Sequence, residues 1–276
     1  MKVLRVGLLS GGISSALTCI EMIRRYGKEN SVIINHDITG RVEDQDIKRF
    51  KQEVADYLGM EITYVNMDGW EDKDPLDVCM EIGAFKVGNG SALCTSYMKT
   101  QPFQKWLKAN YPVKRGQMRE DVVFYYGFSS DEKVRITRRV GIMAAQGYMT
   151  DYPLASWHFT KRTIYDLSEI GIKPPRTYEM FRHANCKGCL KSGKQQWYII
   201  FCTDYDYFKK AIRAEEQIGY SILKDTYLSD LECKFASMKA LGIEPTEKVG
   251  FQRFWADVRK MLKESEDILP CECSVA

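Results

Sequence analysis

The chain has 276 residues, of which 45% are hydrophobic, and this length is enough for one large domain or for one domain plus a smaller one. A formal net charge of +3 excludes a strongly basic protein and neither requires nor excludes a nucleic-acid partner. No apolar run approaches the ~18 residues of a membrane span. The N-terminal sequence Met-Lys-Val-Leu-Arg-Val-Gly is typical of a first strand and not of a signal peptide. We therefore expect a cytoplasmic protein without a membrane partner.

A glycine-rich loop follows the first predicted strand. The apolar run 3–9 predicts that strand, and residues 16–23 predict a helix. Two glycines let the backbone approach an anion, and the N-terminus of the following helix attracts it. Serine hydroxyls add donors. The segment predicts a phosphate-binding loop, with an ordinary glycine turn as the alternative; its candidate nucleotide-binding residues are Ser10, Gly11, Gly12, Ser14 and Ser15.

Strands and helices alternate through the first half of the chain. Apolar runs at 31–35, 61–65 and 121–126 predict three further strands, and residues 44–58 and 102–110 predict helices. This order is typical of an α/β protein with a doubly wound, mostly parallel sheet and helices on both faces. Ligands are then expected beyond the carboxyl ends of the strands. We expect a nucleotide-binding domain over residues 1–180 and a helical, cysteine-containing region over 181–276.

Polar residues follow the second predicted strand. His36, Asp37 and Thr39 lie at a strand end that should be next to the glycine loop. Their side chains suit a ribose or an adenine edge at the ligand-binding end of the sheet. A polar surface loop is the alternative.

Charged residues follow the fourth predicted strand. Gly127 permits a close turn, and Glu132 with its neighbour Asp131 has the chemistry either to hold Mg²⁺ at phosphates or to cap the next helix. Three arginines then recur near helical spacing, so at least two share a face that suits phosphate or sulfate oxyanions. A solvated basic helix face is the alternative. The arginines are Arg135, Arg138 and Arg139, of which the first two are candidate catalytic residues.

The cysteines indicate thiol, metal or redox chemistry. Nine cysteines, an odd number in a protein expected to be cytoplasmic, argue against disulfides. Cys186 and Cys189 form a Cys-x-x-Cys pair, and Cys94 is the leading third metal ligand. Three thiolates suit an iron–sulfur cluster with one open iron, or zinc with a fourth ligand such as His183 or Cys79. A redox dithiol is the third alternative. Near the C-terminus, Cys273 suits a nucleophilic or sulfur-carrying thiol, or no function at all.

These segments together resemble the phosphoadenosine phosphosulfate (PAPS) reductase-like family of PP-loop ATP pyrophosphatases, also described as adenine nucleotide α-hydrolase-like, over about residues 1–205. The resemblance lies in the Ser10–Ser15 loop, Asp37-Ile38-Thr39-Gly40, Cys94 with Lys99 and Pro102, Gly127–Arg138, Tyr152-Pro153-Leu154-Ala155-Ser156-Trp157 and Cys186 with Cys189. It implies a Rossmann-like PP-loop fold with a helix over 160–170. It also implies an adenine nucleotide substrate, ATP or PAPS/APS, together with Mg²⁺.

The chain differs from the family in its cysteines, and these differences bear on which of the family's activities it has. The chain has Cys94-Thr95 where cluster-bearing reductases have two cysteines, and three cluster cysteines resemble the tRNA thiolation enzymes. The leading hypothesis is therefore an ATP pyrophosphatase and adenylylating sulfurtransferase that uses a cysteine-bound 4Fe–4S cluster, with zinc as the alternative metal. The second is a PAPS or APS reductase, an oxidoreductase with Cys273 as nucleophile. The third is a non-catalytic nucleotide-binding subunit of a larger complex. The expected partners are a sulfur donor such as a cysteine desulfurase, or a thioredoxin-like reductant. A nucleic-acid acceptor and an oligomer are compatible with each.

Overall fold

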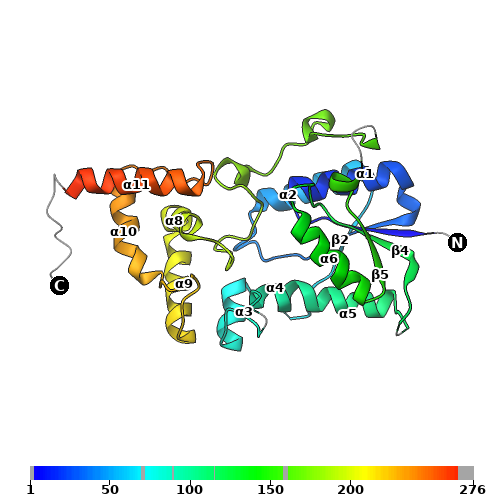
Figure 1. The fold of residues 1–276 in the computed structure, drawn as a ribbon, viewed down its shortest axis with the longest axis horizontal. Coiled ribbons are helices and arrows are strands. Elements are labelled where there is room, and N and C mark those ends of the chain that lie inside the picture. The colour runs from blue at the N-terminus through cyan, green and yellow to red at the C-terminus, as the bar shows by residue number, and fades with distance from the viewer. Residues whose placement is uncertain (1–2, 70–71, 89, 115, 158–160, 267–276) are drawn as a thin grey trace. The chain divides into compact units, whose positions relative to one another are not determined.

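The computed structural model describes residues 3–69, 72–88, 90–114, 116–157, 161–266 (Figure 1). The chain divides into two compact units, which we call unit 1 and unit 2. Unit 1 comprises Met1–Asp72 and Thr95–Thr177, and unit 2 comprises Lys73–Cys94 and Tyr178–Ala276. The segment Lys73–Cys94 thus joins the cysteine-containing region, although the sequence pattern places it in the nucleotide-binding domain. In the described residues, no helix is long and apolar enough to cross a membrane.

Unit 1 is an α/β unit built on a five-stranded, all-parallel sheet. The strand order is β3-β2-β1-β4-β5, so β1 lies at the centre of the sheet. The four predicted strands are present, each within a few residues of its expected limits. The strands are β1 (Leu4–Leu8), β2 (Ser31–Asn35), β3 (Ile62–Tyr64), β4 (Arg119–Tyr125) and β5 (Tyr148–Asp151).

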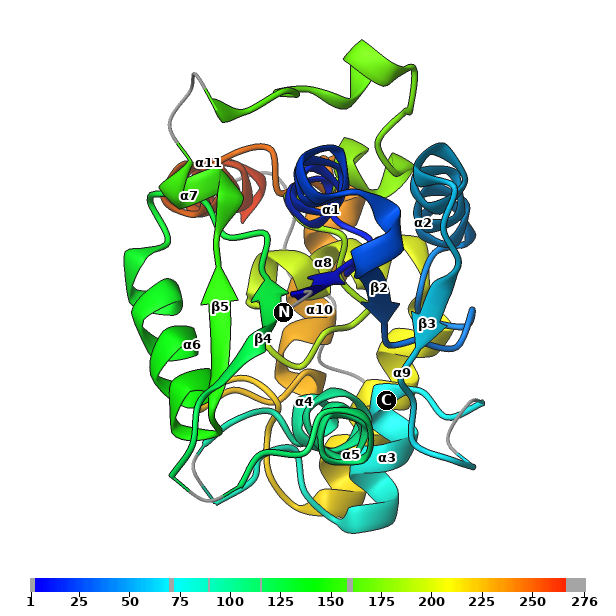
Figure 2. The ribbon, with the colours of Figure 1, turned by 90° about the vertical axis from the view of Figure 1, so that its right-hand side faces the viewer.

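Neighbouring strand residues point into two different cores. Ile33 and Tyr125 belong to one cluster, whereas Ile34 and Phe124 belong to the other. Helices α1 and α2 pack on the first face, and α5 and α6 contribute to the second. Figure 2 shows α1 and α2 on one side of the sheet and α5 on the other. Helices on both faces of a parallel sheet are consistent with a doubly wound fold. The helices are α1 (Ile13–Tyr26), α2 (Gln45–Leu58), α5 (Gln101–Asn110), α6 (Lys133–Ala145) and the short α7 (Pro153–Ser156).

Local signals define the ends of α2. The Asp44 carboxylate accepts a hydrogen bond from the Asp46 amide at 2.8 Å, and Gly59 ends the helix in a left-handed conformation with φ of 59°. The predicted limits of 44–58 are therefore confirmed to within one residue. Unit 1 also has short 3₁₀ turns at Lys28–Asn30 and Leu167–Ile170, and a third at Arg176–Glu179 lies where the chain passes from unit 1 to unit 2. A π-helical turn at Ser96–Thr100 leads into α5.

Two features of unit 1 differ from the sequence expectations. Strand β5 was not predicted, because it has only four residues and no clear apolar alternation. The helix expected over 160–170 is wrong for the described residues, because 162–166 are irregular and Leu167–Ile170 forms only a 3₁₀ turn. The reason is the buried Glu21 carboxylate, which accepts hydrogen bonds from the amides of Thr163 and Ile164 at 2.6 and 2.9 Å. Those amides are held by another element and cannot join a helix ladder.

Unit 2 is helical around an aromatic core. Its helices are α3 (Pro75–Ile82), α8 (Lys194–Thr203), α9 (Tyr205–Ile218), α10 (Ser229–Ala240) and α11 (Phe251–Glu266); the short α4 (Leu93–Thr95) spans the boundary with unit 1. Trp197, Tyr198, Phe208 and Phe235 are fully buried. Phe208 and Phe235 lie with ring centroids 6.0 Å apart. Burial of rings of this size dominates the energetics of such a core.

Candidate functional site

The glycine loop of unit 1 joins β1 to α1. Gly11 has a φ of +86°, which a side chain rarely adopts, and a Cβ atom there would lie 2.6 Å from Ile47 Cγ2. Gly12 is the N-cap of α1, so no side chain caps the helix, and its first turn carries no acidic residue. The positive end of the helix dipole is therefore not neutralised from within the helix. This arrangement suits an anion.

The three serines of the loop have different roles. The Ser15 hydroxyl donates to the Gly12 carbonyl at 2.7 Å and accepts from the Ser10 amide and hydroxyl at 3.0 and 3.1 Å. Ser15 is buried and shapes the loop. Ser14 is exposed, and no hydrogen bond to another described residue involves its hydroxyl. Among the three, Ser14 is thus the hydroxyl placed to contact a ligand.

A glycine that follows β4 packs against the same turn. A Cβ atom on Gly127 would lie 2.7 Å from the carbonyl carbon and oxygen of Ser14 and from the amide nitrogen of Ser15. Because those atoms belong to the backbone, only glycine fits at this position. Gly127 therefore brings the segment after β4 to the start of α1, as switch-point geometry predicts.

A buried ion pair holds the loop from the other side. Lys51 in α2 has a side chain that is 1% exposed, and its Nζ lies 2.8 Å from the Glu43 carboxylate and 3.1 Å from Asn35 Oδ1. The side-chain amide of Asn35 in turn donates from Nδ2 to the carbonyl of Leu9 at the start of the loop. The apolar pattern of α2 did not predict this network. The signal was a lysine on the apolar face of α2, four residues after Ile47.

The residues predicted at the end of β2 have mainly structural partners. The His36 ring Nδ1 lies 2.5 Å from the Val65 carbonyl. Burial lowers the pKa of His36 to about 4; the Val65 hydrogen bond opposes this shift, and the nearby Lys99 charge adds to it. His36 is thus neutral at pH 7, so Nδ1 donates to Val65. The Asp37 carboxylate lies 2.7 Å from Lys48 Nζ, and the Thr39 carbonyl accepts from the Glu43 amide at 3.0 Å.

The carboxylates after β4 accept hydrogen bonds within the turn that leads to α6. The Ser129 amide donates to Glu132 at 3.0 Å, the Ser129 hydroxyl bonds Asp131 at 2.5 Å, and Arg135 pairs with Glu132. Neither carboxylate caps α6, whose N-cap residue Glu132 makes no side-chain capping hydrogen bond, so the capping alternative is wrong; both carboxylates retain the chemistry of a Mg²⁺ ligand. Arg135 also lies over the Phe128 ring, with its guanidinium carbon 4.4 Å from the centroid.

The other arginines of α6 differ in surroundings. Arg139, four residues after Arg135, lies 5.2 Å over the Tyr126 ring, whereas Arg138 is exposed. The rings of Tyr126, Phe128 and Tyr152 stack on one another with centroids 5.9 Å apart. Cation–π contacts hold both guanidinium groups over rings, and Arg135 is in addition paired with Glu132, so this face of α6 has two positioned cations of which one already has a carboxylate partner.

The Cys-x-x-Cys turn lies in unit 2, together with Cys94. Gly188, inside the turn, has a φ of +61°, and a Cβ atom there would lie 2.4 Å from the Tyr207 ring and 3.1 Å from Trp197. The turn is thus seated on the Tyr207 ring. Burial raises the pKa of Tyr207 well above its usual range, with smaller contributions from nearby Asp74, Cys186, Asp77 and Cys94. The Tyr207 hydroxyl is buried and has no hydrogen-bond partner among the described residues.

The thiols of unit 2 differ in exposure, since Cys79 is buried whereas Cys94, Cys186 and Cys189 are partly exposed. Burial raises the pKa of Cys79 to about 12, helped by neighbouring Cys94, while a bond from the Cys94 amide opposes the shift. In the part of the chain that the structure describes, no three or more His, Cys, Asp and Glu side chains are arranged to hold a metal ion. A metal at Cys94, Cys186 and Cys189 therefore remains a prediction, and no step below is assigned to one. Cys273 lies outside the described residues.

The chain was compared with known proteins, and no protein-family model, curated protein or solved structure matches it. The arrangement of its own residues thus carries the functional argument.

Proposed function

We propose that this chain is an adenine-nucleotide-binding enzyme with a Rossmann-like PP-loop fold that acts in sulfur chemistry. Its proposed reaction is that of an ATP pyrophosphatase that activates an acceptor by adenylylation. The observation that carries the proposal is the contact between Gly127 and the backbone of Ser14 and Ser15. It joins two predicted phosphate-binding segments at the uncapped start of α1, where an anion is expected.

The residues of unit 1 have definable roles in such a reaction. The Gly11–Gly12 turn and the Ser14 hydroxyl would hold the phosphates, and Asp131 or Glu132 would hold Mg²⁺, which neutralises phosphate charge. An acceptor oxygen would attack the α-phosphorus, and the bond to the bridging oxygen would break to release pyrophosphate. Arg135 and Arg139 would stabilise the negative charge that develops. A sulfide donor would then form a bond to the acceptor carbon as the carbon–oxygen bond to AMP breaks. A persulfide donor would displace AMP in the same way but remain joined through a disulfide, which a second thiol would cleave to leave one sulfur on the acceptor.

The first experiment measures ATP binding and its products. In isothermal titration with ATP, Ser14→Ala should bind about fivefold more weakly than wild type. This corresponds to about 1 kcal/mol of binding free energy for the loss of one hydroxyl donor. Gly11→Val should abolish binding, because the new side chain meets Ile47 and forces a strained φ. Gly141→Ala is the matched control, since a Cβ atom there meets nothing within 4 Å.

Product analysis separates the proposal from its alternatives. AMP and pyrophosphate in the presence of an acceptor support the pyrophosphatase, whereas ADP and phosphate contradict it. Sulfite release from PAPS or APS that is lost in Cys273→Ser would instead identify a reductase. Tight nucleotide binding without turnover would identify a binding subunit. Full ATP affinity in a folded Gly11→Val variant would refute the PP-loop assignment altogether.

A further inference from the structure

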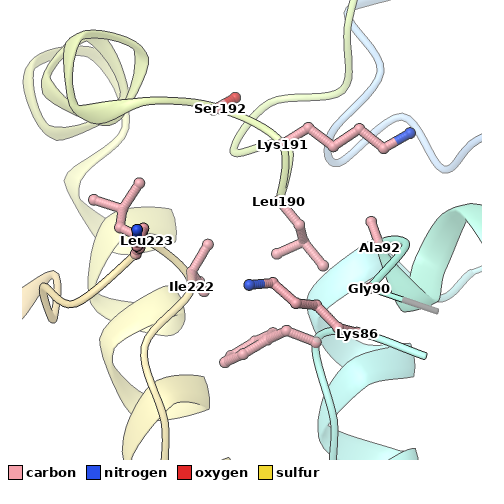
Figure 3. Close-up of a pocket in the computed structure, with 10 residues that line it drawn as sticks. Lys86, Gly90, Ala92, Leu190, Lys191, Ser192, Ile222 and Leu223 are labelled. Carbon is pink, nitrogen blue, oxygen red and sulfur yellow. The ribbon is translucent and has the colours of Figure 1, made fainter. Parts of the chain in front are cut away.

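Unit 2 contains a cavity that the proposed function does not use. Its volume is about 270 Å³, and Figure 3 shows the side chains around it. This volume is close to the lower end of the range for small-molecule sites, so it admits one ring system or one short chain. The lining residues are Phe85, Lys86, Gly90, Ala92, Leu190, Lys191, Ser192, Ile222, Leu223 and Lys224.

The first wall is a short hairpin that is fixed in place. Lys86 and Ala92 form an antiparallel bridge, and the Leu93 amide donates to the Phe85 carbonyl at 2.8 Å. The Tyr220 hydroxyl accepts from the Phe85 amide at 2.6 Å, and the two rings meet edge to face at 5.4 Å. The hairpin is therefore anchored to the end of α9.

The other walls are two further tight turns. The Ser192 amide donates to the Cys189 carbonyl at 2.8 Å and closes a turn that contains Leu190, the residue after the Cys-x-x-Cys pair. Leu223 pairs with Thr226 across a turn in which Asp225 has a φ of 53°. Because each wall is closed by its own hydrogen bonds, the cavity is a built feature and not a gap between loose loops.

The charge of the cavity has one sign. Each turn contributes one lysine, and none of the ten lining residues carries a carboxylate. Within the described chain, no ion pair involves Lys86, Lys191 or Lys224. In Figure 3 the Lys86 ammonium lies between Leu190 and Ile222, whereas Lys191 extends away from them. Lys86 is therefore the cation placed to meet a ligand inside the apolar walls.

We propose that this cavity binds a small organic anion with an apolar body. The body would rest on Leu190, Ile222 and Leu223, and the anionic head would pair with Lys86. A single-stranded nucleic acid is a poorer fit, because such sites stack bases on exposed rings and the one lining ring, Phe85, is 2% exposed. Two sources share the favoured chemistry: a free aliphatic or aromatic acid, and the terminal carboxylate of a peptide whose last residue is apolar.

The test uses the fluorescent anion 5-(dimethylamino)naphthalene-1-sulfonate, which has a single fused ring system, as the probe with the full chain. Wild type should bind it, and Lys86→Gln should bind about tenfold more weakly, the effect of losing one charge-assisted contact. Lys86→Arg should restore most of the affinity. Lys263→Gln, an exposed lysine of α11 outside the cavity, is the matched control. Circular dichroism confirms that the variants are folded.

Competition distinguishes the two sources. Displacement by 4-phenylbutyrate identifies a free acid. Displacement by a peptide ending in phenylalanine, but neither by its amidated form nor by phenylbutyrate, identifies a peptide terminus. Equal probe affinity in wild type and Lys86→Gln would overturn the proposal. So would displacement by an oligonucleotide when neither acid competes. None of these readouts depends on ATP, so failure here and failure of the PP-loop proposal are separate results.

Discussion

The two units fix their candidate binding segments by different means. In unit 1 the glycine loop is held by hydrogen bonds and a buried ion pair, through Asn35, Glu43 and Lys51. In unit 2 the cysteine turn rests on rings, through Gly188 against Tyr207 and Trp197. In unit 1 the network binds the Leu9 carbonyl at the start of the loop and leaves the N-terminus of α1 uncapped, so that an anion can bind there. The arrangement in unit 2 seats the turn on aromatic rings while Cys186 and Cys189 stay partly exposed, which leaves their thiols accessible to a soft metal or a sulfur donor.

The largest expected effect is on the ion pair of unit 1. Lys51→Met removes the main partner of the buried Glu43 carboxylate, and we expect the free energy of unfolding to fall by about 3–5 kcal/mol. Urea unfolding measures this change. Lys48→Met is the control, because Lys48 is more exposed and lies 3.9 Å from Glu43, and it should cost less than about 1 kcal/mol. Equal losses in the two variants would show that burial of the pair does not matter.

The next effect is a pH dependence in unit 1. The pKa of His36 falls from 6.5 to about 4 on folding, so between these values the unfolded chain binds more protons than the folded chain. Stability should therefore fall as the pH decreases from 6.5 to 4, by about 3 kcal/mol from this residue. His36→Gln should remove that part of the slope in denaturant unfolding at a series of pH values. Parallel curves for the two proteins would contradict the assignment.

A smaller effect tests the ring support of unit 2. Gly188→Ala places a methyl group against Tyr207 and keeps a positive φ, so we expect a loss of about 2 kcal/mol in the free energy of unfolding. Gly193→Ala, where a Cβ atom meets nothing within 4 Å, should change it by less than about 1 kcal/mol. If Gly188→Ala were as stable as wild type, the cysteine turn would not be seated on the ring as described.

The smallest effect concerns the segment that replaces the expected helix. Glu21→Gln keeps the shape of the side chain but weakens its bonds to the Thr163 and Ile164 amides, at a cost of about 1 kcal/mol. Hydrogen exchange at these two amides should become faster, while exchange in β1 stays unchanged. Unchanged protection of both amides would show that another group holds this segment.

The sequence predicted features that depend on local chemistry. The limits of α2 follow from Asp44 and Gly59, which act on their own helix, and four strands follow from apolar runs. Features that depend on distant partners were missed. Glu21 holds the amides of Thr163 and Ile164, which lie far from it in the sequence, and the apolar periodicity around these two residues does not indicate that contact.

The candidate site divides in the same way. The glycine loop was predictable, because the conformation of glycines and serines before a helix depends mainly on the neighbouring residues in the sequence. The different roles of Ser14 and Ser15 were not, since they depend on the loop's internal hydrogen bonds. The contribution of Tyr207 was also missed, because its importance comes from Gly188, which packs on its ring from another segment.

Unit 2 is discontinuous in sequence, and this has a consequence for biosynthesis. The segment Lys73–Cys94 leaves the ribosome well before Tyr178–Ala276, and the chain between them takes on the order of ten seconds to synthesise. Until then Leu76, Val78 and Phe85, which are buried in the finished fold, lack the partners that α9 and Tyr220 supply. The nascent chain therefore exposes an apolar patch for seconds, and this interval is when a chaperone that recognises such patches would be most useful.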